Sequence, residues 1–132
     1  MPRLEAVHPV LGCRDVMRAV RFYERLGFGL AFVDSTERPT YAAITKDTVE
    51  LHLQWADATQ WAPGIDRPAY RFYVSDVDAL YQSFRERGAI DADAPGGGPW
   101  RAPADTPWAT REFHLRDADG NGLHFYRDRP VS

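Results

Sequence analysis

The sequence predicts an α+β fold built from two similar modules, each with the order strand–helix–strand–strand–strand. Two observations predict the duplication. Each half contains a helical pattern that starts after an aspartate and stops at a glycine 12 positions later, which is the expected placement of an N-cap and a C-terminal stop. The residues that bound these helices are Asp15 and Gly27, then Asp76 and Gly88. In addition, Leu51-His52-Leu53 near the end of one half matches Leu123-His124-Phe125 in the other.

The first module is predicted to cover residues 1–62. Alternating polarity over Glu5–Cys13 predicts the first strand. The helix follows Asp15, because apolar residues then recur at helical spacing up to Leu26. The three remaining strands of this module are predicted at Phe28–Asp34, Thr40–Thr45 and Thr48–Trp55.

The second module is predicted to cover residues 66–132, after a loop at Ala56–Pro68 that contains three Pro/Gly breakers. The two modules together form a single domain, 1–132. Asp91–Trp108 is rich in glycine and proline and is expected to hold one short strand and a flexible loop at residues 95–99. The other predicted strands are Ala69–Ser75, Thr110–Arg116 and Leu123–Tyr126, the last two joined by a turn rich in Asp, Gly and Asn.

Composition limits the classes of function. The chain has 132 residues, 44% hydrophobic and 27% charged, with a formal net charge of −3. A negative net charge argues against a nucleic-acid partner. No apolar run reaches membrane-spanning length, and Cys13 is the sole cysteine, so it has no intrachain disulfide partner. These features together predict a cytoplasmic protein that does not interact with membranes.

One helix can cover only one face of each predicted sheet. The other face carries polar residues at strand spacing. In an arbitrary sheet such residues would simply face water. The side chains predicted on these uncovered faces are His8, His52, Arg71, Tyr73, Glu112, His114 and His124.

Two motifs resemble a known family. PW-x-x-RE-F…D-x-DGN-x-L-x-F lies within residues 107–126, and RDVMRAVRFYERLGF covers Arg14–Phe28. Both are similar to the vicinal oxygen chelate superfamily, in particular its glyoxalase/bleomycin-resistance protein/dioxygenase group, and the resemblance runs from Val7 to Tyr126. It implies that the sheets of two modules curve into a shared cleft. In the bleomycin-resistance proteins this cleft lies at a homodimer interface, so the expected partners are a second copy and a small molecule.

The leading functional hypothesis is that the protein binds an antibiotic-like compound, flat and aromatic or peptidic, and sequesters it without changing a bond. Related proteins stack aromatic side chains on the drug near Trp108 and in the loop that contains Trp61. Glu50 and Glu112 could complement a positive group, whereas Arg71 favours a ligand of mixed polarity. The predicted ligand-binding residues are Tyr41, His52, Trp61, Tyr73, Trp108, Glu112 and His124; no catalytic residue and no cofactor is assigned.

The alternative is a metal-dependent lyase, isomerase, dioxygenase or thiol transferase. Metal-using relatives take ligands from the first and last strands of each module, and the matching positions here are His8, His52, Ala69 and His124. Ala69 provides no ligand atom, and His124 stands where a glutamate is usual, so the candidate ligands for a divalent metal are His8, His52 and His124. A third hypothesis is an accessory module that has no ligand.

Overall fold

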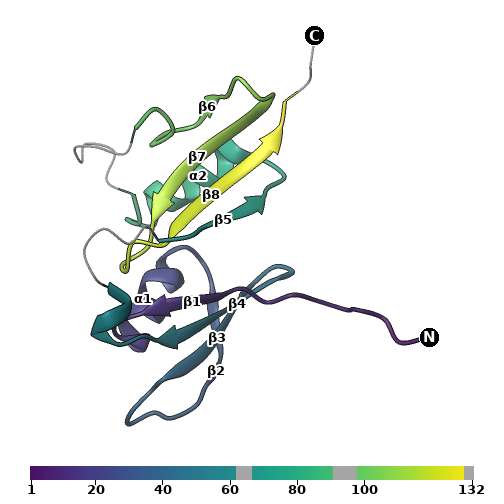
Figure 1. The fold of residues 1–132 in the computed structure, drawn as a ribbon. Helices are drawn as coiled ribbons and strands as arrows, with labels where there is room; N and C mark the ends of the chain where they lie inside the picture. Colours follow the sequence, from purple (N-terminus) through teal and green to yellow (C-terminus); the bar gives the residue numbers. More distant parts are fainter. Residues whose placement is uncertain (62–66, 91–97, 130–132) are drawn as a thin grey trace. The chain divides into compact units, whose positions relative to one another are not determined.

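A computed structural model describes residues 1–61, 67–90 and 98–129. The predicted fold class is confirmed: two mixed four-stranded sheets are each accompanied by one helix (Figure 1). The chain divides into two compact units, Met1–Ile65 and Asp66–Ser132. Each unit is described separately below.

The first unit contains β1 (Val10–Cys13), α1 (Val16–Arg25), β2 (Gly29–Val33), β3 (Tyr41–Lys46) and β4 (Val49–Trp55). The strand order in its sheet is β1-β4-β3-β2. β1 runs parallel to β4, and the other neighbours are antiparallel. This places β1 and β3 on either side of β4, so the side chains of three strands meet around the middle of β4.

The second unit repeats this arrangement with β5 (Ala69–Tyr73), α2 (Val77–Glu86), β6 (Ala104–Asp105), β7 (Thr110–Arg116) and β8 (Gly122–Asp128). Its sheet has the order β5-β8-β7-β6, with β5 parallel to β8 and the other pairs antiparallel. β8 is therefore the central counterpart of β4.

Each helix covers one face of its own sheet and leaves the other face bare (Figure 1). In the second unit, Phe84 of α2 packs edge-to-face on Phe113 and Phe125, whose rings are stacked with centroids 5.0 Å apart. Burial of each large apolar side chain contributes about 1.5–3 kcal/mol. Because successive side chains of a strand point to opposite faces of the sheet, the polar residues lie on the bare face. The buried side chains that form the core of the first unit include Leu11, Val16, Val20, Tyr23, Ile44, Leu51 and Leu53.

The helix boundaries follow the predicted capping pattern. Asp15 and Asp76 have extended backbones, and each side-chain oxygen accepts a backbone N–H three residues further on, at 3.0 Å. Gly27 and Gly88 have φ of 98° and 71°, a left-handed conformation that glycine adopts without a Cβ penalty. The same local chemistry therefore sets the length of both helices.

Several boundaries differ from the prediction. The first strand begins at Val10 instead of Glu5. Residues 1–8 are exposed, and the N–H of His52 donates to the carbonyl of Pro9 at 2.9 Å just before the strand. The linking loop contains a short 3₁₀ helix, η1 (Ala58–Trp61), that was not predicted. Of the glycine-rich loop, residues 95–97 lie outside the described residues. In the described part of the chain, no helix is long and apolar enough to cross a membrane.

Candidate functional site

A buried carboxylate organises the bare face of the second sheet. Glu112 on β7 has no solvent-exposed surface. The guanidinium of Arg71 on β5 reaches it across β8, with Nη1 donating to Oε1 at 3.2 Å and Nη2 to Oε2 at 3.0 Å. Two parallel hydrogen bonds of this kind fix both the distance and the orientation of the two groups.

Three further side chains donate to the same carboxylate. Trp108 donates its indole N–H to Oε2 at 3.3 Å, and Thr110 donates its hydroxyl to Oε2 at 2.5 Å. His114 lies 2.7 Å from Oε1 through Nε2. An ionised carboxylate can only accept, so this imidazole nitrogen carries the proton. These hydrogen bonds replace the water that an exposed carboxylate would have, so the buried Glu112 side chain can remain charged.

The pKa of Glu112 reflects this balance. Burial alone would raise its pKa, but hydrogen bonds from Arg71, Thr110 and His114 outweigh burial and hold the pKa at about 2. The local sequence places these donors around the carboxylate. Alternate residues of β7 face the same side of the sheet, so Thr110, Glu112 and His114 lie together, and Ala109 turns the chain before them with φ of 66°. This turn brings the Trp108 ring back over the strand that follows it.

Six rings lie on or beside this bare face, and we call them the aromatic face: Tyr73, Trp100, Trp108, His114, His124 and Tyr126. The imidazoles of His114 and His124 are stacked with centroids 3.8 Å apart and planes 15° from parallel. The Trp100 ring lies 5.6 Å from the His114 ring and 5.3 Å from that of Trp108. Trp108 and Tyr73 are 53% and 55% exposed. The face therefore combines ordered rings with a large accessible apolar area.

Positive charge surrounds the imidazole of His124. The carbon of the Arg71 guanidinium lies 4.1 Å from the Tyr126 ring centroid, and Nη1 of Arg71 is 3.5 Å from Nδ1 of His124. Burial lowers the pKa of His124, and the neighbouring His114 and Arg71 side chains lower it further. His124 is therefore neutral at pH 7.

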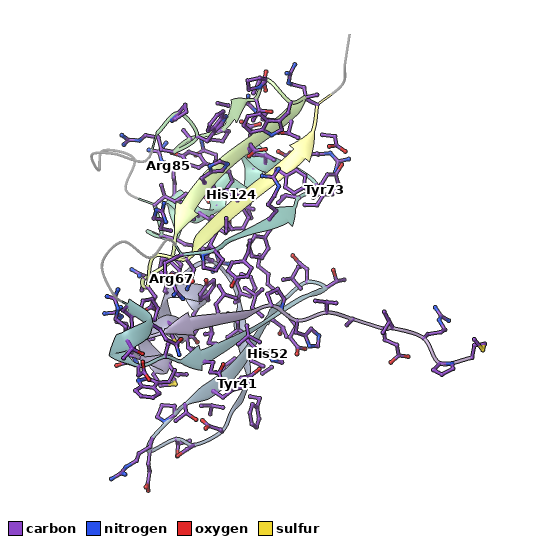
Figure 2. All side chains as sticks on the ribbon, viewed as in Figure 1. Tyr41, His52, Arg67, Tyr73, Arg85 and His124 are labelled. Carbon is purple, nitrogen blue, oxygen red and sulfur yellow. The ribbon has the colours of Figure 1, made fainter. Side chains whose placement is uncertain are left out.

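The first sheet carries a different group of polar side chains, which we call the histidine–glutamate cluster: His8, Tyr41, Glu50 and His52. Oε2 of Glu50 lies 2.6 Å from Nε2 of His52 and 3.3 Å from Nδ1 of His8. The hydroxyl of Tyr41 lies 2.6 Å from Nδ1 of His52. The hydrogen bond with His52 is the main cause that lowers the pKa of Glu50. Figure 2 shows Tyr41 and His52 on the first sheet, and Tyr73 and His124 on the second.

The structure divides the predicted site residues into groups. Tyr73, Trp108, Glu112 and His124 come together in the second unit, and Tyr41 and His52 come together in the first. In the first unit, the indole N–H of Trp61 donates to the Ala56 carbonyl at 3.0 Å, and the Arg14 guanidinium lies 4.7 Å from its ring.

Glu112 was predicted to line the wall of a ligand site. In the structure its side chain has no exposed surface, and its carboxylate is in hydrogen-bonding contact with Arg71, Trp108, Thr110 and His114. Trp100 was not among the predicted site residues. Its segment has no periodic pattern, and a hydrogen bond from the His114 N–H to its carbonyl, 2.7 Å long, joins it to β7.

The family model of the Glyoxalase/Bleomycin resistance protein/Dioxygenase superfamily matches residues 6–125. The chain belongs to this superfamily. An uncharacterized protein of Mycolicibacterium smegmatis is 30% identical over 122 residues, which cover 89% of this chain and 88% of that protein.

Solved structures of bleomycin-binding proteins share the fold. A bleomycin-binding protein complexed with bleomycin has a TM-score of 0.75 at 23% identity, covering 96% of this chain and 100% of that one. The bleomycin-binding protein of Streptomyces verticillus, complexed with copper(II)-bleomycin, has a TM-score of 0.71 at 27% identity, covering 99% and 100%. These likenesses support ligand binding as the type of function at the level of the family.

Proposed function

We propose that the protein binds a flat aromatic or peptidic small molecule, of the antibiotic type that bleomycin represents, and sequesters it by equilibrium binding. The observation that carries the proposal is the aromatic face. Its exposed rings, Trp108 and Tyr73, are large apolar surfaces that a planar ligand could cover. Stacking on an aromatic ring contributes about 0.5–1.5 kcal/mol beyond the burial of area.

Preorganisation supports this function. Trp108 and His114 are held by the same buried carboxylate, and His114 in turn stacks on His124. Rings fixed before binding lose little conformational entropy when a ligand arrives, which raises affinity.

The indole N–H of Trp100 is buried and has no acceptor among the residues that the structure describes. Because this N–H is buried, a ligand could accept from it only after the surrounding side chains move.

Replacing Trp108 with alanine is expected to weaken binding of the ligand by about tenfold or more, as for an aromatic hot spot. Isothermal titration calorimetry with bleomycin, followed by a panel of flat aromatic antibiotics, measures the change. Trp61→Ala tests the second predicted anchor in the same way. Trp55→Ala is the matched control, because Trp55 is 52% exposed, close to the value for Trp108, and the alternation along β4 places it on the opposite face from His52. Unchanged affinity in both Trp61→Ala and Trp108→Ala would contradict the proposal.

The proposed ligand site is shared between two copies of the chain, as the family resemblance implies. Exposed apolar side chains support an interface on the first sheet: Leu30 and Phe32 on its edge strand β2 are 42% and 54% exposed. We expect size-exclusion chromatography with light scattering to give twice the 15.0 kDa mass of one chain. Phe32→Glu should shift the protein toward the monomer, since a buried charge opposes association. A monomer at all micromolar concentrations would refute the shared site.

A further inference from the structure

We propose that the aromatic face selects a ligand that carries a negative group, a carboxylate or a similar oxyanion, and that Arg71 recognises this group. The inference rests on the proposed function, because it names the chemical class of ligand for the same site. It differs from the expectation that Glu112 would complement a positive group on the ligand. The charge that a ligand meets here depends on which ionised side chains are accessible on the bare face of the second sheet.

The two members of the Arg71–Glu112 ion pair differ in accessibility. The side chain of Arg71 is 40% exposed, whereas that of Glu112 is 0% exposed. Nη1 and Nη2 of Arg71 each donate a hydrogen bond to Glu112, and a guanidinium has five N–H donors in all. A ligand on this face therefore meets a guanidinium that can still donate hydrogen bonds, and it cannot reach the carboxylate.

The surroundings of Arg71 preserve its positive character. Its cross-strand neighbour His124 is neutral at pH 7, and its guanidinium carbon lies over the ring of Tyr126, 4.1 Å from the centroid. The exposed carboxylate of Asp128 accepts a hydrogen bond from Tyr73 and lies four residues along β8 from His124. Four residues of a strand span roughly 13 Å. This exceeds the screening length of about 8 Å at physiological salt, so Asp128 offsets the charge of Arg71 only weakly.

The same network places a stacking surface next to the guanidinium. Oε2 of Glu112 accepts from Nη2 of Arg71 and also from the indole N–H of Trp108, so the guanidinium and the indole lie around one oxygen atom. A flat ring stacked on Trp108 could therefore present a carboxylate substituent to Arg71. The planar guanidinium matches the geometry of a carboxylate, and it is already held in place before binding.

Three probes with the same flat ring test the charge preference: anthraquinones that carry a carboxylate, a neutral carboxamide or a cationic aminomethyl group at one ring position. Quenching of tryptophan fluorescence at pH 7 gives their dissociation constants. The carboxylate should bind about tenfold more tightly than the carboxamide, because a charge-assisted hydrogen bond is stronger than a neutral one. The cationic probe should bind most weakly. Added salt should reduce the tenfold difference, since it screens an exposed charge.

The double variant Arg71→Gln/Glu112→Gln tests the role of Arg71. It removes both charges of the pair together, so no buried carboxylate is left unpaired. The ratio of the carboxamide and carboxylate dissociation constants should fall from about ten to about one, and any change in stacking that both probes share cancels in this ratio. Circular dichroism checks that the variant is folded.

Arg111→Gln/Asp78→Asn is the matched control. It also removes an arginine–carboxylate pair with two hydrogen bonds, and the alternation along β7 places Arg111 on the opposite face from Glu112. The ratio of the two dissociation constants should stay at the wild-type value.

Equal affinities of the wild type for the carboxylate and carboxamide probes would overturn the charge preference and leave the proposed aromatic binding in place. Tightest binding of the cationic probe would have the same meaning. A tenfold ratio that persists in the folded Arg71→Gln/Glu112→Gln variant would show that another group selects the anion, and would overturn the role of Arg71. Failure of all three probes to bind would count against the proposed function itself, and the charge preference would fall with it.

Discussion

Replacement of Glu112 by alanine is expected to lower the free energy of unfolding by about 3 kcal/mol or more, the cost of removing one partner from a buried ion pair. The variant would leave the Arg71 guanidinium without its carboxylate. It would also leave the ring N–H groups of Trp108 and His114 without their acceptor, whereas the Thr110 hydroxyl would keep the Thr106 hydroxyl as a partner at 2.8 Å. Each unsatisfied buried donor adds about 1–3 kcal/mol. Urea unfolding monitored by circular dichroism measures the change.

Asp78→Asn provides the comparison for this effect. Asp78 also forms a two-pronged ion pair with an arginine, Arg111, at 2.8 and 2.9 Å, but it is exposed. Loss of an exposed pair of this kind typically costs no more than about 1 kcal/mol. Equal stability losses in Glu112→Ala and Asp78→Asn would show that burial of Glu112 does not determine its contribution.

Acid is expected to remove the stabilisation that Glu112 provides. Its pKa is about 2 in the folded protein, below the ordinary value of 4.5. A depressed carboxyl pKa means that the unfolded chain binds the proton more tightly, so the contribution is full above about pH 4.5 and declines as the pH falls toward 2. The difference between these two pKa values corresponds to about 3 kcal/mol.

The difference in stability between wild type and Glu112→Gln isolates this contribution, because the other acidic groups titrate in both proteins. That difference should be constant between pH 5 and 7 and should shrink progressively below about pH 4.5. Denaturant unfolding at a series of pH values gives the curve. A difference that stays the same down to pH 2.5 would mean that Glu112 titrates normally in the folded state.

Much of the fold was predictable because its signals are local. The capping aspartates and terminal glycines mark both helices, and strict alternation along residues 110–116 and 123–126 gives the facing of the last two strands. The start of the first strand was predicted too early because polarity also alternates in the exposed chain before Val10. Alternation cannot show whether a neighbouring strand is present to pair with.

The sequence predicted which site residues share a face of each sheet, but it did not predict which of their side chains contact one another. The alternation placed Glu112 with His114 and Glu50 with His52, but a period of two does not distinguish a buried side chain from an exposed one on the same face. The guanidinium that pairs with the buried Glu112 belongs to Arg71, which is 41 positions away in sequence. Trp100 joins the aromatic face from an irregular segment, where no periodicity could reveal it.

The two sheets repeat the same strand pairing, but the residues at matching positions differ in charge. His52 and His124 occupy matching positions on β4 and β8, yet their cross-strand neighbours differ: Val10 and Ala43 flank His52, whereas Arg71 and His114 flank His124. The same imidazole on the same backbone therefore lies beside a carboxylate, that of Glu50, in one sheet and beside a guanidinium, that of Arg71, in the other. One architecture thus places two matching histidines in opposite electrostatic surroundings.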